Sequence, residues 1–260
     1  MLHNLKIEWL KVKNYSTFWI LSSLFIVSIF GINFITYVLP APKSKDPMAS
    51  AVVGTPFKFP EVWHTVAYLS SFLLFIPGLL IIIFITNEFS FKTHRQNIID
   101  GMSRSEFIVT KMIIALLVSI MSTILVFLTA YFFGLNEGGN VSFKGIEYIG
   151  YYFVQAISYS GIAIVFALLF KRSGITIGVY FLYIVVLENL LAGILNKLTN
   201  HFGSYLPLES TDSLIPFPFF QALTKNLIYK PNITVLLILA VIYLIAYYIF
   251  SKRNFETADL

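Results

Sequence analysis

The chain has 260 residues, of which 57% are hydrophobic and only 12% are charged, about half the charged share of a soluble domain. A soluble protein of this length cannot bury so much apolar surface, so the composition predicts an integral membrane protein. The sequence has no cysteine, which excludes disulfides and thiolate metal sites. The net charge of +5 comes from basic residues that flank apolar runs. This pattern indicates membrane topology and not nucleic-acid binding.

The N-terminal residues 1–16 are predicted to form an interfacial helix. Leu2, Leu5, Trp9 and Val12 recur at helical spacing, and the lysines lie off that stripe. Such a helix places its apolar side in membrane lipid and its lysines toward anionic headgroups. A merely basic flank to the first span is the alternative that the pattern leaves open.

Six apolar stretches are long enough to cross a hydrocarbon core of about 30 Å at about 1.5 Å per residue. They predict an all-α fold: one polytopic transmembrane domain over residues 1–260. Pro77 and Gly78 predict a kink near the middle of the second span. The expected spans are residues 17–39, 64–86, 108–134, 150–170, 174–196 and 233–250.

Residues 87–107, between the second and third spans, are too polar to lie in hydrocarbon. Phe91, Ile98 and Met102 fall roughly on one face at helical spacing, which predicts a short amphipathic helix. Gly101 is suited to end that helix because glycine adopts left-handed backbone angles easily.

A capping box is predicted to begin the next helix. In Ser103-Arg104-Ser105-Glu106, the Ser103 hydroxyl and the Glu106 carboxylate can satisfy each other's free backbone N–H groups. Met102 and Phe107 are placed for the accompanying hydrophobic staple. A structured segment of this kind favours a docking surface for a soluble partner, and a plain solvated hairpin is the alternative.

The second half of the chain holds a carboxylate inside an expected span. A charge at the centre of a bilayer costs at least about 2.5 kcal/mol, so such residues usually face protein or water. Glu188, with Asn189, is therefore a candidate for a transport pathway. The alternative is a carboxylate that reaches the headgroups or pairs with a lysine. Gln155, in the fourth span, is interpreted as an interhelical hydrogen-bonding group, and residues 197–231 are expected to form an external loop.

The distribution of basic residues predicts the topology. Six spans place both termini on one side of the membrane, and that side holds eleven lysines and arginines against seven on the other. Because cytoplasmic segments are enriched in Lys and Arg, both termini are expected in the cytoplasm.

The sequence contains no GxxxxGK[ST] phosphate loop and no metal or redox motif. The run Tyr159-Ser160-Gly161 is reminiscent of a hydrolase, but no histidine lies deep in a span to act as its base. The chain is therefore expected to be neither an enzyme nor a holder of any cofactor of its own.

Several features together define a layout. Glu8-Trp9-Leu10-Lys11-Val12-Lys13 precedes the first span, and a long connection precedes the sixth. In the polar segment, Asn87-Glu88 is followed by Arg95, by the run from Gly101 to Phe107, and by Lys111. This layout resembles the permease subunit of type-2 ATP-binding-cassette exporters, in the small bacterial branch that includes lantibiotic-immunity and antibiotic-resistance permeases.

The resemblance implies that residues 87–107 form a coupling helix that inserts into a cytosolic ATPase subunit, which holds the ATP and Mg. It also implies a second permease copy, short re-entrant helices in the external loop, and residence in the bacterial cytoplasmic membrane. The expected substrate is an amphipathic or lipid-like peptide, antibiotic or lipid. The competing hypothesis is a membrane scaffold or immunity protein that binds a peptide or lipid without transporting it. The expected ATPase-coupling residues are Phe91, Arg95, Ile98, Ile99, Gly101, Met102, Arg104 and Glu106.

Overall fold

The computed structural model describes residues 2–39, 55–138, 140–199, 201–219, 229 and 231–257. In these ranges the regular structure is entirely helical, so the all-α prediction is confirmed. Residues 40–54, between the first two expected spans, and residues 220–228 of the expected external loop lie outside the described residues, as do the side chains of Leu2 and Leu5. The first helices are α1 (Leu2–Lys13), α2 (Ser16–Val38), α4 (Val62–Ser71), α5 (Phe75–Ser90), α6 (Thr93–Ile99) and α7 (Arg104–Asn136). The later ones are α8 (Glu147–Phe170), α9 (Ser173–Leu182), η1 (Tyr183–Leu187), α10 (Glu188–Leu198), η2 (Phe202–Tyr205), α11 (Glu209–Asp212) and α13 (Ile233–Thr257).

Five helices of the described chain are long and apolar enough to cross a membrane. They are α2, α7, α8, the continuous run Ser173–Leu198 and α13. The pair α4 and α5 is bent by 44° and makes a sixth span when counted as one. The fold therefore has the predicted number of spans.

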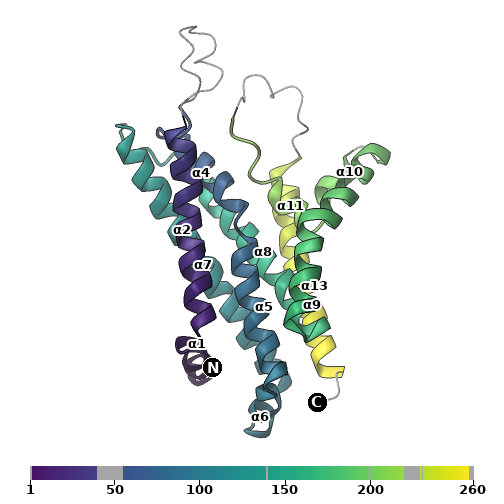
Figure 1. Ribbon diagram of the computed structural model, residues 1–260. Helices are drawn as coiled ribbons and strands as arrows, with labels where there is room; N and C mark the ends of the chain where they lie inside the picture. The colour runs from purple at the N-terminus through teal and green to yellow at the C-terminus, as the bar shows by residue number, and fades with distance from the viewer. Residues whose placement is uncertain are drawn as a thin grey trace.

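The helices form a bundle with two distinct ends (Figure 1). We call the end that carries α1, α6 and both chain termini the lower end, and the opposite end, with α10 and α11, the upper end. Helix α8 is central, because it packs against α4, α5, α7, α9 and α13. Its small side chains allow close approach: a Cβ on Gly161 would lie 2.7 Å from the ring of Tyr247 on α13.

The second span is broken, not simply kinked. Helix α4 ends at Ser71 and α5 begins at Phe75. Pro77 explains this position, because a proline ring clashes with the carbonyl four residues earlier and cannot donate a hydrogen bond to it. The predicted kink is confirmed, but the break lies in the turn before Pro77. Gly78 allows close packing, since a Cβ there would clash with the hydroxyl oxygen of Tyr180.

The fifth span contains a π-helical turn. Tyr183–Leu187 interrupts the α-helical hydrogen bonding between α9 and α10. The Asn189 amide donates to the carbonyls of Ile184 and Val185, at 3.0 and 3.3 Å. π-Turns are often found at functional sites.

The last helix is longer than the span 233–250 that the hydropathy predicts, since α13 continues to Thr257. Phe255 is the reason for the extension. Its ring stacks on that of Phe107 at 4.5 Å between centroids, and its side chain is buried. The lower end of the bundle is therefore closed by the C-terminal turns.

Candidate functional site

Helix α6 is a short helix below the bundle that connects α5 to α7 (Figure 1). Lys92 has a left-handed backbone, with φ of 58°, and separates α5 from α6. Gly101, with φ of 100°, makes the turn after α6. These two left-handed residues bound a compact tip that contains the short helix predicted from the sequence, with Gly101 directly after its end.

The tip residues divide into inward and outward groups. Ile98 and Met102 pack against the buried cluster that contains Phe107. Phe91 and Ile99 are 72% and 77% exposed. The prediction that Phe91 shares the face of Ile98 is wrong, because the left-handed Lys92 turns the chain between them.

The predicted capping box is confirmed. Ser103 is the N-cap of α7; its hydroxyl accepts from the Glu106 N–H at 3.2 Å, and its own N–H donates to the Glu106 carboxylate at 2.8 Å. Arg104 instead reaches the end of α13, where its guanidinium donates to the carbonyls of Phe255 and Glu256. Gly101, Met102, Arg104 and Glu106 thus build the tip.

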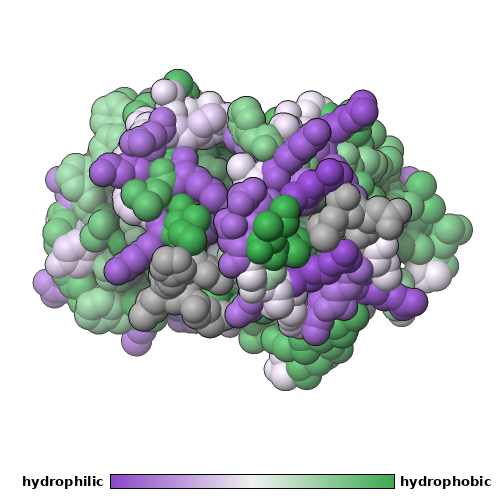
Figure 2. Space-filling view, turned by 90° about the horizontal axis from the view of Figure 1, so that it is seen from below, coloured by the Kyte–Doolittle hydropathy of each residue, from purple (hydrophilic) through white to green (hydrophobic). Residues whose placement is uncertain are grey.

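The exposed side chains at the tip are mixed in character. Arg95 is exposed, like Phe91 and Ile99. Viewed from below, hydrophilic residues gather over the middle of the molecule, with separate hydrophobic residues among them and more hydrophobic residues around the edge (Figure 2). Apolar side chains within a polar rim are typical of protein-binding surfaces.

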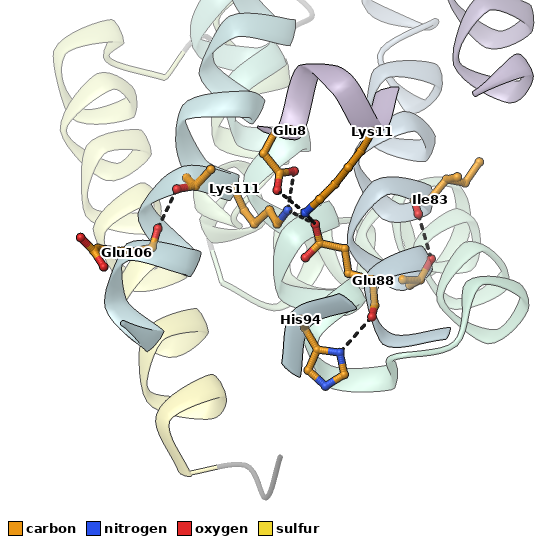
Figure 3. Close-up of polar contacts among 9 residues, drawn as sticks. Glu8, Lys11, Ile83, Glu88, His94, Glu106 and Lys111 are labelled. Atoms are coloured by element: carbon orange, nitrogen blue, oxygen red, sulfur yellow. Dashed lines mark hydrogen bonds and ion pairs between the residues drawn. The ribbon is translucent and has the colours of Figure 1, made fainter. Parts of the chain in front are cut away.

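Four charged side chains from three helices meet inside the lower end (Figure 3). The Lys111 ammonium of α7 lies 2.6 Å from a carboxylate oxygen of Glu8 on α1 and 2.6 Å from one of Glu88 on α5. Lys11 closes the ring, at 2.8 Å from Glu8 and 2.9 Å from Glu88. We call these residues the charge cluster. Its two carboxylates and two ammonium groups balance.

Three members of the charge cluster are enclosed by protein, and the fourth, Lys11, is partly exposed. Lys111 is 2% exposed, and Glu8 and Glu88 are also buried. A buried charge without partners is strongly unfavourable, so the cluster holds α1, α5 and α7 in one arrangement. Helix α6 is also connected to the charge cluster, because His94 Nδ1 lies 2.9 Å from the backbone carbonyl oxygen of Glu88 (Figure 3). A carbonyl oxygen only accepts hydrogen bonds, so Nδ1 carries the hydrogen.

The electrostatics of α1 reflect these contacts. Burial alone raises the pKa of the Glu8 carboxyl, but the ammonium groups of Lys111 and Lys11 outweigh it and hold the pKa below its ordinary value of 4.5. Burial likewise lowers the pKa of the Lys11 ammonium, and Glu88 and Glu8 reverse the effect and raise it above 10.5. Both groups are therefore charged at neutral pH.

The expected pathway residues lie near the upper end, and the structure separates them. Glu188 is 3% exposed, and its Oε1 accepts from the N–H groups of Leu208 and Glu209 at 2.5 and 3.1 Å. It anchors the start of α11 to α10. Asn189, one residue on, is exposed and lines a cavity.

That cavity also contains polar groups that sequence reasoning missed. Asp212, at the end of α11, accepts from Gln155 Nε2 at 2.7 Å and from the Tyr159 hydroxyl at 3.1 Å. Gln155 is thus a hydrogen-bonding group, as interpreted, but its partner lies on the short helix α11 and not on another span. The available signal was the polar run Glu209-Ser210-Thr211-Asp212 inside a connection that is otherwise largely apolar.

Comparison with known proteins adds no relative: no protein-family model matches the chain, and no curated protein matches it. The assignment therefore depends on the helices and on the way their few charged groups are paired. The chain is a multi-pass helical membrane protein. Its two candidate sites lie at opposite ends of the bundle: the α6 tip at the lower end and the cavity beside Asp212 toward the upper end.

Proposed function

We propose that this protein is the membrane subunit of an ATP-driven exporter, energised by a separate ATPase that docks on the α6 tip. The observation that carries the proposal is the tip itself. A loop that only joins two spans does not need two left-handed residues, a capping box and a buried tie from His94. These features support a surface of fixed shape.

The charge cluster supplies the connection from that surface to the spans. A displacement of α6 acts on the Glu88 backbone through His94, and Glu88 shares its carboxylate with Lys11 and Lys111. Movement at the tip is thereby passed to α1, α5 and α7 together. In this proposal the ATPase binds ATP and Mg, a second copy or a sister chain completes the pathway, and the lower end faces the bacterial cytoplasm.

The test is co-purification of ATP hydrolysis. The tagged chain is purified from the membranes of its own host, and Mg-dependent ATP hydrolysis in the preparation is measured. The double variant Phe91→Ser/Ile99→Ser should reduce it about tenfold or more at equal yield of the chain, because central apolar anchors each carry about 2 kcal/mol or more of binding energy. Val141→Ser removes an exposed apolar side chain from the α7–α8 connection at the upper end and serves as the matched control.

The result that overturns the proposal is equally direct. A wild-type preparation without ATP hydrolysis, or a double variant that retains all of it, would leave a membrane protein that binds its ligand without transport as the better conclusion.

A further inference from the structure

A cavity of about 460 Å³ lies toward the upper end, between α4 and α5 on one side and η1 and α10 on the other. Its size is within the range of about 300–1,000 Å³ that small-molecule sites occupy. Both walls contain an interruption of regular helix, at Phe72–Leu74 and at Tyr183–Leu187. Interrupted spans are common around the binding sites of membrane transport proteins because they leave room and free backbone groups at depth.

The cavity extends well below the upper ends of the spans. Gln155 and Tyr159, which line it, lie eight and twelve residues from the upper end of α8 at Glu147. At 1.5 Å per residue these distances are about 12 and 18 Å. The cavity therefore reaches well below the level at which α8 begins.

The polar lining contains two acidic side chains. Asp212 and Glu209 both line the cavity. In the part of the chain that the structure describes, neither forms an ion pair with Lys or Arg. The hydrogen bonds that Asp212 accepts come from Gln155 and Tyr159, which carry no charge. A carboxylate in such surroundings favours a cation nearby.

Gln155 gives a second, independent indication of a ligand. It is 3% exposed, and its Oε1 has no hydrogen-bond partner among the described residues. Its orientation is fixed, since Nε2 is the amide atom able to donate to the Asp212 carboxylate. A buried acceptor left without a donor is unfavourable, so a ligand that brings a hydrogen-bond donor to this atom would be stabilised there.

We propose that this cavity binds the primary ammonium head of a cationic amphiphile. The ammonium group supplies both the positive charge that Asp212 and Glu209 lack and the N–H donor that Gln155 Oε1 lacks. Tyr68, Phe72 and Phe217 line the same cavity and present rings to the apolar body and, through their π faces, to the cation. This ligand would be the molecule that the proposed exporter transports, and only that step rests on the proposed function.

The experiment measures binding to the full chain in phosphatidylcholine nanodiscs, without ATPase. Three probes share one apolar body, the 4-phenylbutyl group: 4-phenylbutylammonium, 4-phenylbutanol and 5-phenylpentanoate. The ammonium probe should bind about tenfold or more tightly than the alcohol, as a charge-assisted hydrogen bond provides about 1.5–3 kcal/mol. The carboxylate probe should bind least. Equal affinity for the ammonium and alcohol probes overturns the proposal, whatever any variant does.

Variants locate the site. Asp212→Asn and Glu209→Gln should each weaken the ammonium probe several-fold and leave the alcohol probe nearly unchanged. Glu147→Gln is the matched control, because Glu147 is exposed at the upper end of α8 and does not line the cavity. An equal loss in Glu147→Gln would mean that the probe responds to general surface charge, and would contradict the site.

The lipid composition of the nanodiscs distinguishes two sources of the ammonium group, a lipid headgroup and a soluble amphiphile. If phosphatidylethanolamine nanodiscs suppress binding of the probe, the amine of a lipid headgroup occupies the same site. If they do not, the site selects a soluble amphiphile, and the ammonium site stands in both cases. Since no ATPase is present, failure here leaves the docking of an ATPase on α6 untouched, and failure of that docking leaves this binding result unaffected.

Discussion

At the scale of single residues, Lys111 is the most deeply buried member of the charge cluster. Its ammonium group lies within 2.6 Å of two carboxylates and is 2% exposed, whereas the side chain of Lys11 is 31% exposed. The two lysines have the same partners and differ in access to water. They therefore form a natural pair for measuring what burial does to an ion pair.

We expect Lys111→Met to destabilise the protein by about 3–5 kcal/mol, because it leaves buried carboxylate charge without compensation. Lys11→Met should cost much less, since water can reach its place. Adding Glu8→Gln to Lys111→Met restores the charge balance and should recover part of the loss. Unfolding in SDS titrations of the purified protein gives these free energies, and equal losses for the two lysine variants would contradict the ranking.

The attachment of α1 should depend on pH. The lowered pKa of Glu8 means that its stabilisation is fully present above its ordinary pKa of 4.5 and is lost as the pH falls through the lower folded value. The raised pKa of Lys11 makes its contribution complete below 10.5 and lost as the pH rises further. A fluorophore on Leu10→Cys, the single cysteine in the chain, should therefore gain mobility below about pH 4.5. Glu8→Gln should alter that acid transition, and an unchanged transition would refute the assignment.

At the scale of elements, short polar devices fix the ends of the helices. The Ser103–Glu106 box begins α7 directly after the α6 tip. The Glu188 carboxylate holds the start of α11 against α10. Each device stabilises the geometry of one connection, so its loss should be local.

Ser103→Ala should loosen the first turn of α7 by about 0.5–2 kcal/mol. That change corresponds to roughly two- to thirtyfold faster hydrogen exchange at the Glu106 amide. Ser105→Ala is the control, since Ser105 follows the cap and takes no part in it. Exchange that is equal in both variants would show that the box does not restrain the tip.

Glu188 allows a test of shape against charge. Glu188→Gln keeps an oxygen that can accept from the N–H groups of Leu208 and Glu209, and should change the free energy of unfolding little. Glu188→Leu leaves both donors unsatisfied and should cost about 1–3 kcal/mol. Thermal unfolding of the purified variants separates them. A Gln variant as unstable as the Leu variant would show that the charge itself is required.

At the scale of the whole molecule, the basic residues gather at one end. Helices α1 and α6, the turn between α8 and α9, and the end of α13 all lie at the lower end (Figure 1). The Lys and Arg excess of eleven over seven therefore belongs to one surface. From the positive-inside rule we propose that this surface faces the cytoplasm.

Single cysteines at two exposed positions test this topology, because the chain has no cysteine of its own. Asn140→Cys, at the upper end, should react with a membrane-impermeant thiol reagent in intact cells. Ser90→Cys, beside α6, should react only after the cells are opened. Reaction at position 90 in intact cells, without reaction at 140, would reverse the orientation.

Some features of this protein could be read from local sequence. The spans follow from runs of apolar residues, because the cost of placing polar groups in hydrocarbon is set by the residues of the run itself. The Ser103 box follows from donors and acceptors three residues apart. A local pattern can still misplace a feature by a turn. The sequence places the kink at Pro77, but the helix breaks in the turn before it, because the proline ring clashes with the carbonyl four residues earlier.

Other features exist only in the folded chain. Lys111 contacts Glu8 and Glu88 across 103 and 23 residues of sequence, and no spacing rule connects residues so far apart. Asp212 belongs to a connection that the sequence places outside the membrane, yet its carboxylate meets Gln155 and Tyr159 well along α8. Apolar runs determine which segments enter the membrane, because each segment's transfer free energy is its own. Only packing determines which buried charges meet, because a charge inside the protein is stable only where other helices bring its partners.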